Sequence, residues 1–449
     1  MYQSVSTYPG ITSMIVPVYI AESSPSAIRG RLVTLNQLFI CIGILLSSII
    51  AGLFSVYRET GWRYMLGLGA LPALVQFVAF IFLPESPRWL LVKGRPDEAR
   101  AVLERISRQD EVDASFSSIV ESLKTDAERS SKSNVVTQIC TTPYVRKALS
   151  IGCGLCIFAQ FSGINTIIYY SGTIMKMAGF PVRHAIWLVC VPNAVVFVAT
   201  FFGLWTVERF GRKPSLCFSI AGVILSLIVV AVGFQLSITD SPAVNTTVLE
   251  IYDNGTQITR CHLQYDMCES CIEDSGCGFC YDDLAHASCL PARDDLASSM
   301  GRCNSSDESS RYTWSHGYCP NQYTWIPVLG MTLFVLAFAP GLGPMPWTVN
   351  AEIYPLWARG ICMSVATACL WVSNLVVSMT FLTLTEKITP YGTFYMFAGI
   401  STLGLLFVFL LLPETKEKTL EEVQKLFMTN DEKRQIQDSK TTAESDTKM

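Results

Sequence analysis

Eight long apolar runs decide what this chain can fold into. Each is long enough for the roughly 20 residues that cross a bilayer as a helix. Half of the residues are hydrophobic and only 16% are charged, which is too little charge to cover a soluble chain of 449 residues. A ninth, shorter run lies near 9–21, and none resembles a signal peptide. We therefore predict an all-α integral membrane protein with spans at 32–56, 64–83, 147–172, 183–206, 215–238, 323–349, 361–385 and 392–412.

The polar segment 239–322 predicts which side of the membrane faces out. It contains three N-x-[ST] sequons, which are glycosylated only on the extracellular or lumenal side, at Asn245, Asn254 and Asn304. An even number of cysteines in such a module predicts a disulfide framework. Zinc is the alternative, but five residues separate CESC from CGFC, against about 15–20 in a zinc ribbon. The cysteines expected in disulfides are Cys261, Cys268, Cys271, Cys277, Cys280, Cys289, Cys303 and Cys319.

Basic residues mark the opposite side. Arg and Lys gather in the short loops and in the segment 84–146, and positively charged loops stay in the cytosol. The charged tail 414–449 is expected to be cytosolic and disordered. Nine helices would then place the N-terminus outside with no signal to send it there. We therefore expect that an odd number of helices is missing from the start of the chain.

A repeated charged motif predicts that the chain has two related halves. "AESSPSAIRG" at 21–30 and "AEIYPLWARG" at 351–360 share E-x-x-P-x-x-x-R-G. From Glu22 it is 63 residues to Glu85 of "PESPRWL", and from Glu352 it is 62 residues to Glu414 of "PETKEK". Two helices fill each interval, as in transporters built from parallel repeats with the substrate site between them. Coincidence between two short charged loops is the alternative.

These motifs carry a resemblance to a known family. "VERFGRK", "PESPRWL", "QFSGINTIIYYS", "GPMPW", the doubled E-x-x-P-x-x-x-R-G and "PETKEK" resemble the sugar porters of the major facilitator superfamily. The resemblance implies a fold of twelve helices, of which about nine are present, from the fourth onward. The domains expected are 1–83, the remnant of an N-terminal bundle; 84–146, a cytosolic loop with amphipathic helices; 147–238 and 323–413, the C-terminal bundle; 239–322, the extracellular insert; and 414–449, the tail.

Polar residues inside one apolar helix predict a substrate site. "AQFSGINTIIYY" places Gln160, Asn165 and Tyr169 within three turns, and a buried amide costs free energy unless it has partners. Amides are both donors and acceptors, which suits a polyol with many hydroxyls and no charge. Helix–helix contact is the alternative use of such residues. The resemblance adds Trp347, a flat face for a sugar ring, and Asn374, whereas an interfacial tryptophan is the alternative for Trp347.

Prolines predict a hinge in one helix, and charged residues predict a network at the cytosolic helix ends. "FAPGLGPMPWTV" is expected to hold a broken or bendable helix, because each internal proline removes a helix hydrogen bond. Its hinge residues are Gly341, Gly343, Pro344 and Pro346. In the family, charged residues at cytosolic helix ends resemble a latch that closes when the carrier faces outward. Simple positive-inside anchoring is the alternative. The residues expected in this charge network are Glu22, Arg29, Glu85, Arg88, Glu208, Arg212, Glu352 and Arg359.

Two departures from the family limit the functional prediction. No Asp or Glu lies within any predicted span, so the residues themselves do not support proton coupling. Sugar porters also pair two glutamines where this chain has Ala159 and Gln160. We expect a multi-pass carrier, in the plasma membrane, for a small neutral polyol or hexose such as myo-inositol, with H⁺ as an open second partner. We expect no enzyme activity, cofactor, metal or nucleic acid; the alternatives are a truncated product that does not transport and a binding or receptor role for the extracellular loop.

Overall fold

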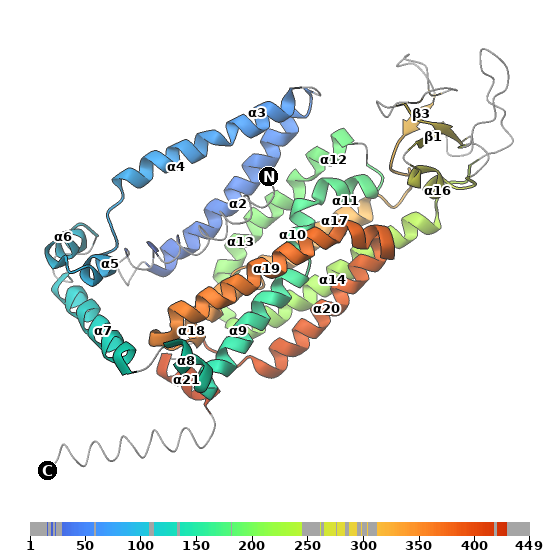
Figure 1. Cartoon of the computed structure of the whole chain (residues 1–449). Helices are drawn as coiled ribbons and strands as arrows, with labels where there is room; N and C mark the ends of the chain where they lie inside the picture. Colours follow the sequence, from blue (N-terminus) through green and yellow to red (C-terminus); the bar gives the residue numbers. More distant parts are fainter. Residues whose placement is uncertain are drawn as a thin grey trace, which may run out of the picture.

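The computed structural model describes residues 16, 19, 20, 23, 29–57, 60–106, 112–132, 135–180, 182–244, 261, 265–274, 276–282, 287–293, 298, 303, 312–416 and 420–428. Figure 1 shows a long helical bundle with a small strand-containing module beyond one end. The first third forms α2 (Arg29–Phe54), α3 (Gly61–Leu68), α4 (Ala70–Phe82), α5 (Pro87–Val92), α6 (Pro96–Ile106), α7 (Val112–Lys132) and α8 (Val135–Thr141). The bundle forms α9 (Pro143–Phe161), α10 (Ile164–Tyr169), α11 (Ser171–Met177), α12 (Val182–Leu188), α13 (Cys190–Phe210), α14 (Arg212–Thr239), α17 (Trp325–Phe338), α18 (Met345–Ile353), α19 (Leu356–Ile388) and α20 (Pro390–Leu411).

The core lies where α9, α14, α17, α19 and α20 pack side by side (Figure 1). Phe234 of α14 stacks on Phe394 of α20 with ring centroids 5.6 Å apart, and Phe381 of α19 meets Phe394 at 6.3 Å. Small residues bring helices close together. A Cβ on Gly330 of α17 would lie 2.6 Å from Cγ2 of Val230 on α14. Tight packing and lipid-facing apolar surfaces are what the all-round apolar pattern predicts.

Helices long and apolar enough to cross a membrane confirm six of the predicted spans. Two further predicted spans, 32–56 and 323–349, contain shorter apolar helices. The ninth run, 9–21, lies almost entirely outside the described residues. Two of the predicted spans contain an interruption: 147–172, where the sequence predicted none, and 323–349, where the prolines of 338–349 predicted a broken or bendable helix. A left-handed glycine interrupts the first, and a turn of several residues rich in glycine and proline interrupts the second.

The first part of the chain meets the bundle through α2, which lies along α12 and α13 (Figure 1). Gly52 of α2 leaves room for the Trp187 ring of α12, 3.0 Å from where a Cβ would stand. On the same interface the Cys41 thiol lies 3.3 Å from the Thr200 hydroxyl. By contrast, α4 is set apart from the bundle and none of its residues is buried.

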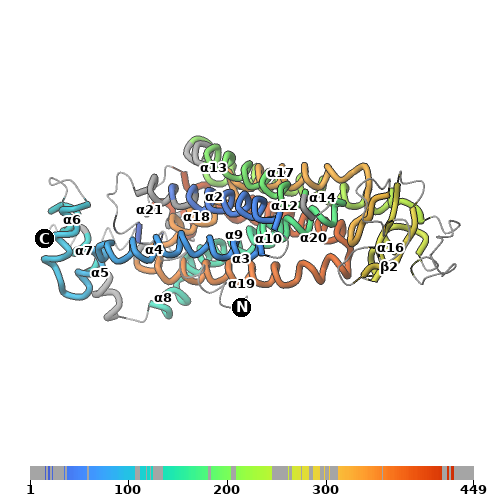
Figure 2. Tube along the Cα trace, turned by 90° about the horizontal axis from the view of Figure 1, so that it is seen from above, coloured from blue at the N-terminus to red at the C-terminus, as the bar shows by residue number. Residues whose placement is uncertain are grey.

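The segment 84–146 contains α5 to α8, and α5, α6 and α7 pack on one another. Pro87 stands at the start of α5, where a missing N–H costs nothing, and the Ser86 hydroxyl accepts from Trp89 N at 3.3 Å. Leu90 and Leu103, both at most 3% exposed, form the small shared core. Figure 2 places α5, α6 and α7 beyond one end of the bundle and the strand-containing module beyond the other.

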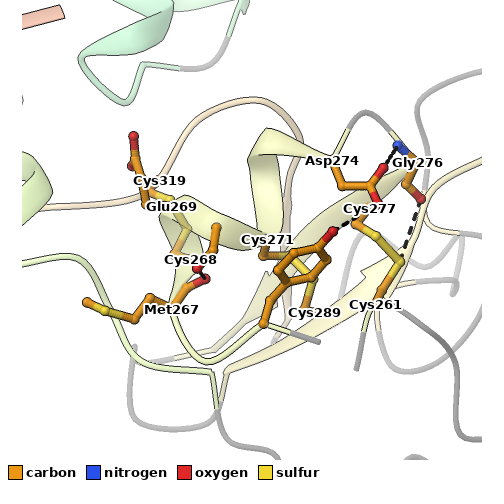
Figure 3. The surroundings of a disulfide bond; sticks show 12 residues. Cys261, Met267, Cys268, Glu269, Cys271, Asp274, Gly276, Cys277, Cys289 and Cys319 are labelled. Carbon is orange, nitrogen blue, oxygen red and sulfur yellow. Dashed lines mark hydrogen bonds between the residues drawn. A yellow bond between two sulfur atoms is a disulfide. The ribbon is translucent and has the colours of Figure 1, made fainter. Parts of the chain in front are cut away.

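The extracellular insert predicted at 239–322 contains a small module held by disulfides. It comprises α16 (Cys268–Glu273), β1 (Cys277–Tyr281), β2 (Ala287–Pro291) and β3 (Thr313–Ser315), and the antiparallel sheet has the order β2-β1-β3. All eight predicted cysteines are paired, which confirms the disulfide interpretation and removes the zinc alternative. Figure 3 shows the surroundings of the Cys261–Cys277 bond. The pairs are Cys261–Cys277, Cys268–Cys319, Cys271–Cys289 and Cys280–Cys303. The sequons Asn245, Asn254 and Asn304 lie outside the described residues.

The described part of the tail, 414–416 and 420–428, differs from the prediction of a disordered segment over 414–449, and the rest of the tail lies outside the described residues. Residues 414–416 are hydrogen-bonded to the bundle, and α21 (Leu420–Phe427) follows them. Val423 and Phe427, four residues apart, lie on one helix face and are 1% and 3% exposed. That apolar face packs on the ends of α9 and α18, which is why a charged segment is helical here.

Candidate functional site

The break between α9 and α10 builds the first wall of the candidate site. The Ser162 hydroxyl donates to the carbonyl of Ala159 at 2.7 Å and closes the end of α9. Gly163 follows with φ 88°, a left-handed conformation that strongly favours glycine. A Cβ at Gly163 would also lie 3.1 Å from the Phe397 ring. The chain therefore restarts as α10 with the end of α9 and the start of α10 close together.

This break brings together two of the predicted substrate residues. Asn165 in the first turn of α10 donates through Nδ2 to Oε1 of Gln160 at 2.5 Å, and Gln160 is only 8% exposed. Within the described part of the chain, the Gln160 Nε2 group and the Asn165 Oδ1 atom have no hydrogen-bond partner. The pair therefore offers a donor and an acceptor, held in place by each other, to an uncharged hydroxyl ligand.

Trp347 of α18 packs against a small apolar cluster. Cys156 of α9 forms this cluster with Ala366 and Leu370 of α19, and Trp371 also packs against it. Cys156 precedes Gln160 by four residues, so both side chains lie on one face of α9. The candidate site therefore has an aromatic and aliphatic floor beneath a polar layer, an arrangement suited to a ring with an apolar face and hydroxyl edges.

Asn374 and Tyr169 lie in different surroundings. Asn374 of α19 is 6% exposed, accepts from the Ser378 hydroxyl at 3.0 Å, and stands one turn from Leu370 on the same helix face. Tyr169 is 57% exposed, and its neighbour Tyr170 makes the contact between helices by donating to the carbonyl of Ser378 at 2.8 Å. Asn374 is therefore buried on the α19 face that carries Leu370, whereas the Tyr169 side chain is exposed.

The break between α17 and α18 contains three of the predicted hinge residues, Gly341, Gly343 and Pro344, and the fourth, Pro346, lies in the first turn of α18. Ser219 of α14, which sequence reasoning missed, satisfies the backbone groups that the break exposes. Its hydroxyl donates to the carbonyl of Ala337 at 2.7 Å and accepts from Leu342 N at 3.0 Å. A Cβ on Gly341 would lie 2.3 Å from the Ser219 Cβ. The interruption is thus packed against α14, as non-helical backbone at membrane depth requires.

A charged cluster lies at the end of the bundle opposite the module. Nη2 of Arg212, at the start of α14, donates to Glu352 of α18 at 2.7 Å, and its Nε contacts both carboxylate oxygens at 3.2 and 3.3 Å. The Thr415 hydroxyl donates to the same carboxylate at 2.6 Å. This ion pair joins two of the predicted network residues that are 140 positions apart in the chain.

The Glu414 carboxylate caps the start of α14, a role that the sequence motif "PETKEK" did not predict. Its carboxylate accepts from the backbone N–H groups of Arg212 at 3.0 Å and Lys213 at 2.9 Å, and from Thr415 and Lys416 at 3.0 and 2.8 Å. The first N–H groups of a helix have no partner within the helix and attract negative charge. Burial by itself would raise the pKa of Glu414, but these four hydrogen bonds outweigh it and hold the pKa below its ordinary value.

Three of the remaining predicted network residues have described side chains: Arg359, Glu85 and Arg88. Arg359 donates to the carbonyl of Tyr354 at 3.3 Å, and among the described residues its Nε is buried without a partner. Glu85 and Arg88 are exposed at the start of α5. Glu22 and the side chains of Arg29 and Glu208 lie outside the described residues.

Comparison with known proteins identifies the family. Residues 6–251 and 312–427 match the family model described as Sugar (and other) transporter. The chain belongs to this sugar transporter family. It is 44% identical over 428 residues to the "Proton myo-inositol cotransporter" of Homo sapiens and 35% identical over 449 residues to the "Proton myo-inositol cotransporter hmit-1.1" of Caenorhabditis elegans. The alignments cover 93% and 95% of this sugar transporter family member, but 65% and 73% of the respective relatives.

Solved structures show the fold. The sugar transporter family member resembles the "partially occluded inward open conformation of the xylose transporter XylE from E. coli" with a TM-score of 0.62 at 23% identity, over 91% of this chain and 69% of that one. A structure of the same symporter bound to 6-bromo-6-deoxy-D-glucose gives 0.61 at 24% identity, over 93% and 71%. The fold is therefore that of the major facilitator superfamily, and the protein is a multi-pass membrane protein.

Proposed function

We propose that this protein carries a small uncharged polyol or hexose of the myo-inositol class across the membrane. The observation that carries the proposal is the Gln160–Asn165 pair, whose remaining donor and acceptor are unused within the described residues. Neither atom is enclosed without a partner, so both are open to a ligand, and each hydrogen bond to a ligand hydroxyl would contribute about 0.5–1.5 kcal/mol. The names of the two relatives, both myo-inositol cotransporters, support the same substrate class.

The surroundings of the pair favour a neutral ligand. Trp347 packs against a cluster of aliphatic and thiol side chains that Trp371 also contacts. Gln160 and Asn374 above them offer amides, which bind hydroxyls without preferring an anion or a cation. A polyol ring would lie with one face on Trp347 and its hydroxyls toward these amides. No covalent bond changes in such binding, so the proposed activity is transport and not catalysis.

Alternating access needs two states of nearly equal free energy and contacts that form in one of them. The Arg212–Glu352 pair and the Glu414 cap join α14, α18 and the segment after α20 at one end of the bundle. We propose that this end is cytosolic, that the disulfide module with its sequons is extracellular, and that the carrier acts in the plasma membrane. The opposite placement of the two ends in Figure 2 and the oxidising chemistry of the module support this orientation. Proton coupling is the remaining part of the proposal, and the names of both relatives support it.

Tracer uptake into vesicles tests the proposal. The vesicles hold the purified chain, with labelled myo-inositol or glucose outside and with or without an inward proton gradient. We expect saturable uptake of myo-inositol, and we expect Gln160→Ala to raise the apparent KM about tenfold, because a buried hydrogen-bonding group is lost. Gln235→Ala is the matched control, since Gln235 is exposed on α14 and hydrogen-bonds Tyr395. Background uptake by folded wild-type protein would refute the carrier and favour a binding role; an unchanged KM in Gln160→Ala would refute the site.

A further inference from the structure

A buried amide and phenol join α18 to α9 beneath the proposed substrate site. Asn350 is 3% exposed and Tyr354 is fully buried. The Tyr354 hydroxyl donates to Asn350 Oδ1 at 2.5 Å. Asn350 Nδ2 in turn donates to the carbonyl of Pro346 at 2.7 Å, and it lies 3.4 Å from the carbonyl of Gly152 and from the Cys156 thiol. Protein groups thus use the amide donors of Asn350, so this residue is not a substrate ligand.

Gly152 supplies the space for this pair. A Cβ at position 152 would lie 2.1 Å from Asn350 Oδ1 and 2.1 Å from the Tyr354 hydroxyl, far closer than atoms in contact approach. The backbone of Gly152 is helical, so no unusual dihedral explains the glycine. The close approach of the amide and phenol explains it, because any larger residue would push α18 away from α9.

The half-helix α18 depends on such lateral contacts. The turn at 339–344 separates it from α17, so its rotation is not set by a continuous helical hydrogen-bond ladder. Ser219 holds the broken end to α14, and beyond it α18 packs most extensively on α9. Across this contact Asn350 Nδ2 reaches the Gly152 carbonyl and the Cys156 thiol of α9 at 3.4 Å, while the Tyr354 hydroxyl, just after α18, holds the other side of the same amide.

The same contact reaches the floor of the substrate site. Cys156 touches Asn350 through its thiol and packs in the cluster that contains Trp347. Trp347 and Asn350 also stand three residues apart on α18, so a rotation of α18 moves both. A gap of about 1 Å between the indole and a ring placed on it would remove up to about half of their dispersion attraction.

We propose that Asn350 and Tyr354, with the space left by Gly152, are positioning residues that set the place of Trp347 against the polyol. This inference rests on the proposed polyol site and deepens it. Substrate contacts Trp347 and the amide layer, while Asn350 and Tyr354 hold the wall from behind. Loss of the phenol hydroxyl leaves the amide free to turn, and α18 then rotates with it.

The test measures myo-inositol binding to the purified full chain by wild type, Tyr354→Phe, Trp347→Ala and the double variant. We expect Tyr354→Phe to weaken binding about tenfold in the wild-type background and by less than twofold in the Trp347→Ala background, because the hydroxyl acts through the indole. Tyr395→Phe is the control, since it also removes an interhelical hydroxyl hydrogen bond but lies on the exposed face of α20. Equal losses in both backgrounds, or no loss in either, would overturn the proposal.

A second readout needs no substrate. N-ethylmaleimide labels free thiols, and mass spectrometry compares Cys156 with Cys41, which is 1% exposed on α2 and serves as the internal reference. We expect Tyr354→Phe to raise the labelling rate of Cys156 at least fivefold and leave Cys41 unchanged, with Gly152→Ala acting in the same direction. An unchanged Cys156 rate would overturn the positioning role. Wild type that binds neither myo-inositol nor glucose would refute the proposed function, while the labelling still decides the positioning role.

Discussion

The Glu414 cap predicts a specific loss of stability. Glu414→Gln keeps the size of the side chain but removes its charge, and one carboxylate oxygen becomes an amide that donates toward the N–H groups of α14. Two backbone N–H groups at the start of α14 and two directly after residue 414 now face a neutral side chain. Hydrogen bonds to charged groups contribute about 1.5–3 kcal/mol, and helix caps about 0.5–2 kcal/mol. We therefore expect the variant to lose about 2 kcal/mol of unfolding free energy at pH 7.

The direction of the Glu414 pKa shift determines how this stability difference changes with pH. The pKa of Glu414 in the folded protein lies below its ordinary value of 4.5, so the unfolded chain takes up the proton first as the pH falls. The contribution is therefore complete above about pH 5 and is lost as the pH falls through the folded-state pKa. We expect the difference in melting temperature between wild type and Glu414→Gln to be several degrees at pH 7 and to shrink below pH 4.

A thiol-reactive fluorescent dye in detergent measures this transition, because unfolding exposes the buried free thiols of Cys41, Cys156 and Cys362. Glu386→Gln is the matched control, since Glu386 is exposed near the other end of a membrane helix. A melting temperature at pH 7 that is the same in wild type and Glu414→Gln would refute the capping argument. A difference that persists unchanged at low pH would refute its electrostatic origin.

Two further predictions concern glycine conformation and the disulfide module. Gly163→Ala should weaken myo-inositol binding about tenfold. A left-handed alanine costs about 1–2 kcal/mol, so the break that brings Gln160 and Asn165 together would relax. Gly172→Ala is the control in the same binding assay, because a Cβ there meets nothing within 4 Å. Replacing Cys268 and Cys319 by serine opens a loop of 51 residues and should lower the stability of the module by about 4 kcal/mol. Trypsin should therefore cleave the module of the variant faster than that of wild type when both proteins are in vesicles. A wild-type module that is cleaved equally fast before and after reduction would contradict this.

Local patterns in the sequence carried much of the fold. Apolar length predicted the spans, because a helix in lipid must satisfy its own backbone and therefore shows as a long apolar run. The cysteine count predicted the disulfide framework, although the four pairings were open. Proline and glycine predicted an interruption before α18. The interruption at Gly163 was missed, because a single glycine costs a helix only about 1 kcal/mol and does not by itself indicate a break.

The sequence by itself determined the kind of protein: a chain of membrane-crossing helices, a disulfide-bonded insert, and a few amides in an apolar setting. Tertiary structure alone decided which groups meet. The carboxylate of Glu414 accepts a hydrogen bond at the start of α14, 202 residues away, and Asn350 lies at the carbonyl of Gly152, 198 residues away. The physical reason is that helix period and hydropathy are local properties, while the partner of a buried polar atom depends on which helices pack together and on how closely a missing side chain lets them approach.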